Sequence, residues 1–187
     1  MSKKYESRLR NKYENEIAGK LVDEFSIENN MSIPAITKVV VNSGLGEMSK
    51  NKELIGVATR DVATITGQKP SIRKAKISVA SFSLREGQPV GLKVTLRKDR
   101  MYDFLDRLFS IVLPRLRDFR GLSKDSFDNS ANYTMGMVEH TVFPEIDLSN
   151  TAKPFGLEVT IVTNTKEKEK ALRLLELLGM PFEKEEK

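Results

Sequence analysis

Apolar residues recur every three or four positions in four stretches of the chain, which is the spacing of one face of an α-helix. The first stretch includes Leu9, Ile17 and Leu21. The predicted helices cover about 3–26, about 51–66, Asp99 to the region of Pro114, and about 166–178.

Residues at the ends of these stretches suit helix termini. Gly67 and Gly179 follow the second and last helices, where glycine commonly stops a helix. Asp99 and Asn164 precede the third and last helices and can cap them. Pro114 removes a backbone donor, so it is expected to kink or split the third helix.

Short β-branched or alternating runs predict the strands, because side chains alternate between the two faces of a sheet. The predicted strands are Ile36–Asn42, Val90–Lys98, Tyr133–Glu139 and Gly156–Asn164. In the second strand, Leu92, Val94 and Leu96 point one way. Lys93, Thr95 and Arg97 point the other way. One face therefore suits a core, and the other offers cations and a hydroxyl to a polyanion.

This mixture of elements predicts an α+β fold in a single domain over 1–187. We expect a two-layer sandwich with a twisted, mainly antiparallel or mixed sheet. Helices cover one face, and the other face stays open for RNA. The remaining segments are a long basic hairpin-like loop over about 71–89, a polar loop over about 122–132, and a charged tail over 183–187.

The charge of the chain is concentrated in its middle third. Residues 60–120 hold 14 Lys and Arg against 6 Asp and Glu, a local net charge of +8. The rest of the chain has a net charge of −3, which leaves +5 overall. Such an asymmetric positive field is typical of proteins that bind nucleic acid, with an anionic membrane surface as the next partner.

Several classes of function lack their residues. The chain has no cysteine and one histidine, His140, which we interpret as structural or solvent-facing. Gly44-x-Gly46 lacks the third glycine of a dinucleotide fingerprint, because position 49 is Ser. No secretory leader or membrane-spanning run is recognised. The sequence predicts a soluble cytoplasmic protein that is not an enzyme and has no cofactor, metal or small-molecule substrate.

Two alternatives come from other classes. One is an RNA- or nucleotide-processing enzyme that uses a divalent metal bound by carboxylates alone. The other is a protein that binds a membrane surface through the basic loop.

Blocks of sequence in a fixed order resemble the large-subunit ribosomal protein family that binds 5S rRNA, the fifth protein of the bacterial large subunit. The blocks are Val41-Asn42-x-Gly44-x-Gly46-Glu47, Thr66-Gly67-Gln68-Lys69-Pro70 with Lys74-Ala75, Lys93-Val94-Thr95-Leu96-Arg97, Pro114-Arg115-x-Arg117-Asp118-Phe119-Arg120-Gly121-Leu122, Ser126-Phe127-Asp128, Asn132-Tyr133-x-Met135-Gly136 and Phe143-Pro144-Glu145-Ile146. They extend from about residue 15 to Phe182.

The resemblance implies a structural protein of the central protuberance, with 5S rRNA, large-subunit rRNA and other ribosomal proteins of that region as partners. Asn42, Gln68 and Thr95 match the polar residues that the family places against 5S rRNA. Neighbouring cations complete the predicted rRNA site. They are Lys38, Lys69, Lys93 and Arg97.

Two further segments carry implied contacts. The loop from Arg73 to Arg85 matches the family's extended loop toward P-site tRNA, with Arg73, Lys74, Lys76, Ser78 and Arg85 as its contact residues. The segment from Arg120 to Met137 resembles the part that faces a small-subunit head protein across an intersubunit bridge. Arg115, Arg117 and Arg120 are assigned to this bridge or to RNA, with an alternative in which they pair with the protein's own acidic surface.

The sequence departs from the family pattern in two places. Where the family shows Gly-Arg-Gly, this chain has Asn129-Ser130-Ala131, which removes one positive charge and two flexible residues. The tail Glu183–Lys187 is more acidic than the short basic ending of the family.

Overall fold

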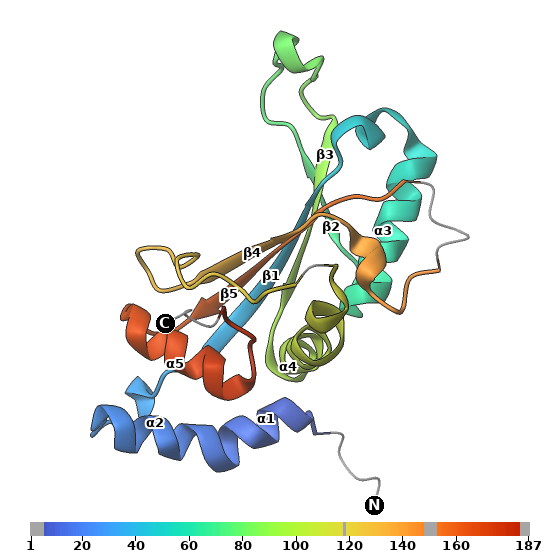
Figure 1. Cartoon of the computed structure of the whole chain (residues 1–187). Helices are drawn as coiled ribbons and strands as arrows, with labels where there is room; N and C mark the ends of the chain where they lie inside the picture. The colour runs from blue at the N-terminus through green and yellow to red at the C-terminus, as the bar shows by residue number, and fades with distance from the viewer. Residues whose placement is uncertain (1–5, 118, 148–152, 184–187) are drawn as a thin grey trace, which may run out of the picture. The chain divides into compact units, whose positions relative to one another are not determined.

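The computed structural model describes residues 6–117, 119–147 and 153–183. Its fold is α+β, as predicted, with one open five-stranded sheet in the order β2-β3-β1-β5-β4 (Figure 1). The strands are β1 Ile36–Gly44, β2 Ser71–Lys74, β3 Pro89–Leu96, β4 Tyr133–Met137 and β5 Leu157–Thr163. The sheet is antiparallel, which agrees with the predicted two-layer sandwich and its mainly antiparallel or mixed sheet.

The helices agree with the predicted segments. They are α1 Arg8–Lys12, the π-helical η1 Tyr13–Ile17, α2 Ala18–Phe25, α3 Lys52–Thr66, α4 Lys98–Arg107, the π-helical η5 Leu108–Val112 and α5 Lys168–Leu178. Short 3-10 turns occur at η2 Asn30–Ser32, η3 Gly46–Lys50, η4 Ala80–Phe82, η6 Leu113–Arg115 and η7 His140–Val142. Gly67 and Gly179 follow α3 and α5 in the left-handed conformation, which confirms the predicted stops.

The chain divides into two compact units, which are described separately below. Unit 1 contains the described residues of 1–39, 97–135 and 160–187. Unit 2 contains the described residues of 40–96 and 136–159. The prediction of a single domain stays a prediction.

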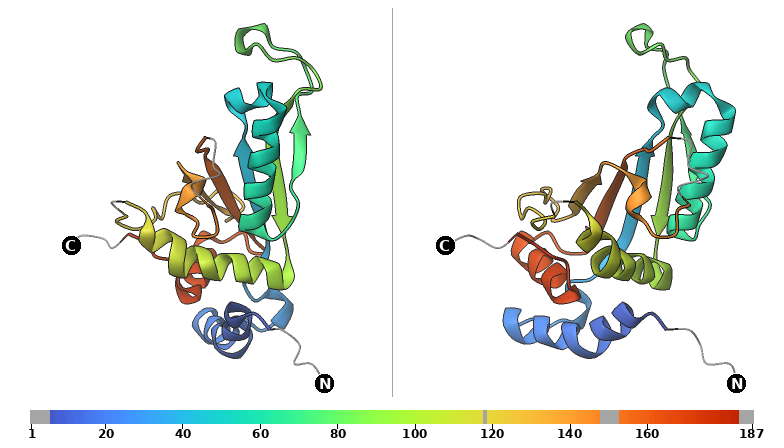
Figure 2. Two further views of the ribbon diagram at one scale, coloured as in Figure 1. Left: turned by 90° about the vertical axis from the view of Figure 1, so that its right-hand side faces the viewer. Right: turned by 45° about the vertical axis from the view of Figure 1, so that its right-hand side comes forward.

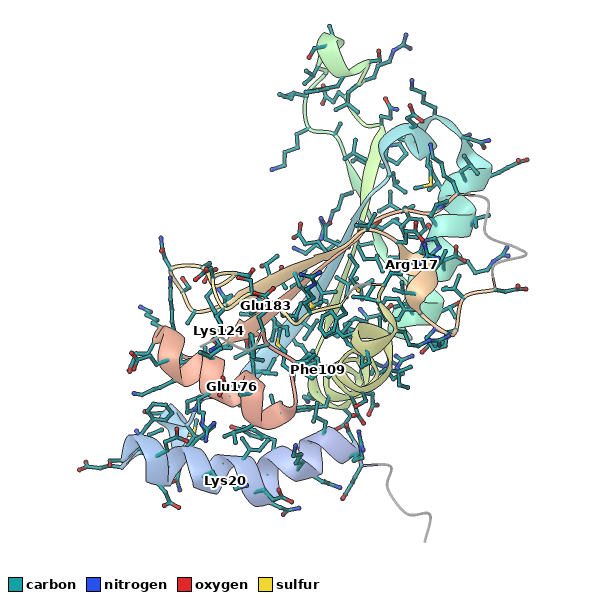
Figure 3. All side chains as sticks on the ribbon, in the orientation of Figure 1. Lys20, Phe109, Arg117, Lys124, Glu176 and Glu183 are labelled. Carbon is teal, nitrogen blue, oxygen red and sulfur yellow. The ribbon has the colours of Figure 1, made fainter. Side chains whose placement is uncertain are left out.

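In unit 1, the N-terminal helix runs from α1 through η1 to α2 and ends at Ser26 in the left-handed conformation. The helix was predicted over about 3–26, and residues 3–5 lie outside the described part. Leu21 is 0% exposed, whereas Lys20 points away from α5 (Figure 3). Burial of the apolar stripe therefore fixes the helix on the core of unit 1.

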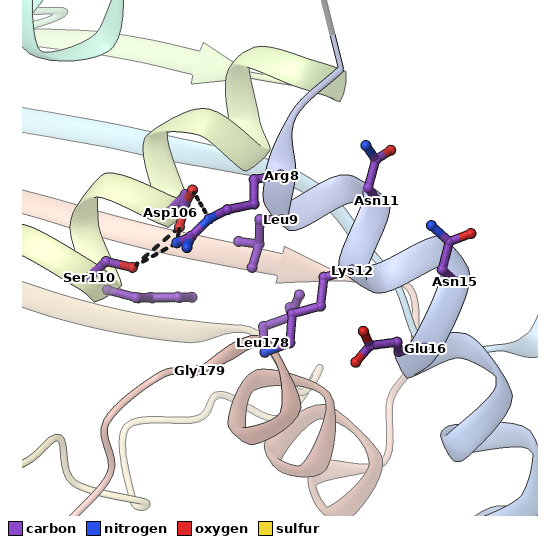
Figure 4. A pocket seen from close by; sticks show the side chains of 11 residues that line it. Arg8, Leu9, Asn11, Lys12, Asn15, Glu16, Asp106, Ser110, Leu178 and Gly179 are labelled. Carbon is purple, nitrogen blue, oxygen red and sulfur yellow. Dashed lines mark hydrogen bonds and ion pairs between the residues drawn. The ribbon is translucent and has the colours of Figure 1, made fainter.

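Polar contacts join the same helix to α4, η5 and α5. The Arg8 guanidinium forms an ion pair with Asp106 and donates to Ser110 Oγ at 3.3 Å (Figure 4). Lys12 Nζ donates to the Leu177 carbonyl at 3.0 Å. The side chains of Arg8, Lys12, Asp106 and Ser110 border a groove of about 570 Å³. Its apolar lining comes from Leu9, Phe109 and Leu178.

Two predicted N-caps are wrong, because tertiary partners take both side chains. Arg97 is the N-cap of α4, and Asp99 instead accepts from Arg10 Nη1 at 2.6 Å. Glu167 is the N-cap of α5. The Asn164 side chain accepts from Ala35 N at 2.8 Å and donates to the Ile33 carbonyl at 2.8 Å, which ties the end of β5 to the chain before β1.

Pro114 lies in η6, after a π-helical turn, so the predicted break of the third helix is confirmed. The π turn and the 3-10 turn change the backbone pairing around the proline, which has no amide hydrogen to donate.

The polar loop over 122–132 is organised by Asp128 in unit 1. Its carboxylate accepts from Ser130 N, Asn132 N and Asn132 Nδ2, each at 2.8 Å. These hydrogen bonds, led by that of the Asn132 side chain, lower the pKa of Asp128. Ala131 is left-handed, with φ 57°, at a position where the resemblance implies glycine. The loop thus keeps a backbone that glycine adopts more easily.

In unit 2, β2 and β3 form an antiparallel hairpin, and α3 packs along β3 (Figure 2). The connection over 75–88 extends beyond the strands as a narrow excursion (Figure 1). A bridge between Val79 and Leu84 closes its tip, and η4 forms the turn. The predicted hairpin-like loop is therefore present, although its first residues, Ser71–Lys74, form a strand.

Candidate nucleic-acid interface

The two faces of β3 differ as the alternating sequence predicts. Leu92, Val94 and Leu96 are buried, and Lys93 and Thr95 are half-buried on the opposite face. The strand ends at Leu96, so Arg97 lies one residue beyond it, and the predicted extent to Lys98 is wrong. Arg97 caps α4 with an extended backbone and an exposed side chain.

The hairpin register adds two residues to the side of β3 that carries Lys93. Ser71 lies directly opposite Lys93, and Arg73 lies opposite Gly91. Directly opposite residues of an antiparallel pair share a face. Arg73 was predicted as a loop residue. Sequence reasoning missed Ser71, because β2 is short, exposed along its whole length and without an alternation of apolar and polar residues.

Asn42 comes from β1, the other neighbour of β3 in the sheet. It is half-buried between buried Val41 and Ser43, so its side chain points away from theirs. A Cβ on Gly91 would lie 3.0 Å from the Ser43 carbonyl oxygen. The two backbones thus approach closely here. The side chains of Asn42, Ser71, Arg73, Lys93 and Thr95 make up what we call the polar face.

Gln68 and Lys69 follow α3 at one end of β3. Gln68 Nε2 donates to the Thr95 carbonyl at 3.5 Å, and Thr66 Oγ1 donates to the Gln68 carbonyl at 3.0 Å. The Thr66 hydroxyl therefore braces the turn through the Gln68 backbone, and the Gln68 side chain lies beside Thr95. Lys69 is exposed and continues the polar surface.

The predicted residues of the 73–85 loop are exposed. Ser78 Oγ accepts a hydrogen bond from Glu86 N at 2.9 Å, so this hydroxyl helps to join the two sides of the loop. The Arg85 backbone amide donates to Gln88 Oε1 at 3.2 Å, while its guanidinium extends into solvent. The loop thus holds its shape through its own hydrogen bonds and leaves its cationic groups unused.

The remaining predicted residues lie in unit 1. Lys38 is half-buried on β1. Arg115, Arg117 and Arg120 are exposed at and after η6, and Arg117 is marked in Figure 3.

The predicted site cations have no carboxylate partners among the residues that the structure describes. They are Lys38, Lys69, Arg73, Lys74, Lys76, Arg85, Lys93, Arg97, Arg115, Arg117 and Arg120. Other cations are paired, such as Arg10 with Asp99, Lys153 with Glu47, and Arg173 with Glu24. The alternative in which Arg115, Arg117 and Arg120 pair with the protein's own acidic surface is therefore not supported by any ion pair among the described residues. Unpaired cations keep their attraction for phosphate.

Within 6–117, 119–147 and 153–183, no group of three or more histidine, aspartate or glutamate residues is placed to hold a metal ion. In the same residues, no helix is long and apolar enough to cross a membrane.

Comparison with known families gives two adjacent matches. Residues 29–85 match the model described as ribosomal protein L5. Residues 89–182 match the model that describes the C-terminus of the same ribosomal family.

Curated relatives agree over almost the whole chain. The large ribosomal subunit protein uL5 of Corynebacterium diphtheriae is 52% identical, with 98% of each chain covered. That of Halothermothrix orenii is 53% identical over 94% of this chain and 98% of the relative. That of Chloroflexus aurantiacus is 54% identical over 94% of this chain and 97% of the relative. These matches confirm the resemblance, and the chain belongs to the uL5 family of large-subunit ribosomal proteins.

Proposed function

We propose that the polar face of unit 2 binds 5S rRNA and helps attach it to the large subunit in the central protuberance. The observation that carries the proposal is one sheet surface with two unpaired cations, Arg73 and Lys93, beside the neutral polar groups of Asn42, Ser71 and Thr95. Membership of the uL5 family makes the chain a structural component of the ribosome. It acts in translation in the cytoplasm and is not an enzyme.

The chemistry of this face suits RNA. Lysine and arginine neutralise phosphates and supply most of the affinity. Amide and hydroxyl groups can hydrogen-bond to base edges, sugars and 2′-hydroxyls, which distinguishes RNA from DNA. Three neighbouring strands, β2, β3 and β1, hold these groups on a fixed backbone, so little ordering is needed on binding.

We assign the other predicted surfaces by the family resemblance. The loop with Arg73, Lys74, Lys76, Ser78 and Arg85 contacts P-site tRNA. Arg115, Arg117 and Arg120 face a small-subunit head protein across an intersubunit bridge, or adjacent rRNA. Large-subunit rRNA and other proteins of the central protuberance complete the set of partners. Exposure and the lack of internal ion pairs among the described residues support these assignments.

The test is a salt-series titration of the full chain against 5S rRNA, with an unrelated structured RNA of similar length as competitor. Lys93→Glu combined with Thr95→Glu places negative charge on the polar face and is expected to weaken binding about tenfold or more. Lys20→Glu combined with Asn15→Glu makes the same change of charge on the exposed side of the N-terminal helix.

Loss of affinity in the first variant, with the control near wild type, supports the polar face. Equal losses in both variants would show that only net charge matters. Unchanged affinity in the first variant would remove the polar face from the RNA site.

A further inference from the structure

Two large apolar side chains are exposed at the tip of the β2–β3 connection. Ile77 is 68% exposed and Phe82 is 79% exposed. Phe82 lies in the turn that the Val79–Leu84 bridge closes, with Val79 N donating to the Leu84 carbonyl at 2.9 Å. An ordered turn thus presents an aromatic ring and a branched chain to water. Such surfaces commonly mark a binding site.

The surroundings of these side chains are cationic. Lys76 and Arg85 lie next to Ile77 and Leu84 in sequence, are exposed, and form no ion pair with any described carboxylate. Glu86 is the single acidic residue of the sequence between 71 and 90. Charge complementarity therefore favours a polyanion that also has apolar surface.

A recess of about 340 Å³ lies beside the tip, within unit 2. Phe82, Leu84 and Val90 contribute apolar surface to its lining. Ser49 and Lys50 contribute polar groups, as does Glu47, whose carboxylate is paired with Lys153 at 3.0 Å. Ser49 Oγ accepts from Gln88 Nε2 at 3.1 Å and keeps its own proton to donate. A ring beside a recess with hydrogen-bonding groups matches a nucleobase, which has flat apolar faces and a polar edge. A lipid surface has no comparable edge.

We propose that Phe82, supported by Ile77, stacks on an unpaired nucleobase of a folded RNA, while Lys76 and Arg85 neutralise the adjacent phosphates. The inference rests on the proposed function in assigning RNA to this loop. It adds Phe82 and Ile77 to the loop's predicted contact residues, which were four cations and Ser78. It also assigns to the tip a preference for unpaired over paired RNA.

The test uses two RNAs of equal length, a stem–loop with 2-aminopurine at the unpaired positions and a fully paired duplex. Each is titrated with the full chain over a salt series. Phe82→Ser is expected to weaken stem–loop binding about 5- to 100-fold, because base–aromatic stacking contributes on this scale. The slope of affinity against salt should stay unchanged, since no phosphate contact is lost. Phe82→Tyr keeps the ring and is expected to stay within about twofold of wild type.

Val138→Ser is the matched control, because Val138 is 87% exposed in the same unit. Equal weakening by Phe82→Ser and Val138→Ser, or equal weakening on stem–loop and duplex, would overturn the inference. So would a Phe82→Ser variant that binds RNA normally but loses binding to anionic vesicles, which would identify the tip as a membrane contact.

The two proposals fail separately. If Lys93→Glu with Thr95→Glu weakens 5S rRNA binding and Phe82→Ser leaves stem–loop binding intact, the stacking inference fails and the polar face stands. If the opposite pattern is measured, the tip stands and the proposed 5S rRNA face fails.

Discussion

His140 Nε2 lies 3.3 Å from Asp61 Oδ2 inside unit 2. The imidazole is 0% exposed and stacks on Phe155, with ring centroids 3.7 Å apart and an interplanar angle of 11°. Phe155 N donates to His140 Nδ1 at 3.3 Å, which places the ring proton on Nε2, facing the carboxylate. The contact joins η7 to α3, so the sole histidine of the chain is a structural residue.

This pair predicts that unit 2 loses stability in mild acid. Burial lowers the pKa of His140 below its ordinary 6.5, and the nearby Asp61 opposes the shift without cancelling it. The unfolded chain therefore takes up a proton more readily than the folded chain as the pH falls through 6.5. The contribution of neutral His140 to the free energy of unfolding is complete above pH 6.5 and is lost as the pH falls toward the lower pKa of the folded state. In this range the free energy of unfolding changes by at most about 1.4 kcal/mol per pH unit.

Denaturant titrations between about pH 7.5 and 5.5 measure this dependence. His140→Gln removes the titrating group. As the pH is lowered, the free energy of unfolding of this variant should therefore decrease less than that of wild type. Parallel curves for the two proteins would contradict the assignment to His140.

Gly121→Ala is expected to destabilise unit 1 by about 1–3 kcal/mol. Gly121 has φ 116°, and an added Cβ would lie 2.5 Å from Glu183 N and 2.6 Å from Glu183 Cα. The clash would separate Leu122 from Phe182, which pair as a parallel bridge. Chemical denaturation measures the change in the free energy of unfolding.

Gly19→Ala serves as the control for that substitution. Gly19 lies on the exposed side of α2, and an added Cβ would meet nothing within 4 Å. Alanine should therefore raise the free energy of unfolding by about 0.5–1 kcal/mol. Similar changes in the free energy of unfolding at both glycines would show that the close contact of the Glu183 backbone with position 121 does not destabilise the Gly121→Ala variant.

Leu21→Ala and Arg173→Ala separate the two kinds of contact that hold the N-terminal helix. Leu21 is 0% exposed, so its truncation should lower the free energy of unfolding by about 2–5 kcal/mol. Arg173 pairs with Glu24 at 2.8 Å near the surface, and its loss should change that free energy by less than about 1 kcal/mol. Urea titrations of both variants check the order, and a larger effect at Arg173 would contradict it.

Paired and unpaired lysines should differ in their contribution to RNA binding. Lys93→Gln is expected to reduce the slope of log affinity for 5S rRNA against log salt by about 0.7–0.9, the contribution of one phosphate contact. Lys153 pairs with Glu47 at 3.0 Å, so Lys153→Gln should leave the slope near wild type. The same reduction of the slope in both variants would show that an ion pair within the protein does not keep a lysine from contacting RNA.

Local elements could be predicted from the sequence, because their physics acts between near neighbours. Alternation along Leu92–Leu96 predicts which side of β3 is buried, and the apolar stripe of α3 with Gly67 behind it predicts that helix. The charge of the middle third predicted a nucleic-acid partner, and the ordered blocks of residues carried the resemblance to the family that the comparisons confirm.

Contacts between distant groups required the tertiary structure. Asp99 and Asn164 have side chains that suit helix caps. Each instead contacts a residue far away in sequence, Asp99 with Arg10 and Asn164 with Ala35 before β1. Ser71 shares the face of Lys93 through the hairpin register, and Asp61 meets His140 through the position of η7 against α3. Such contacts depend on how strands pair and loops close, so no local periodicity in the sequence records them.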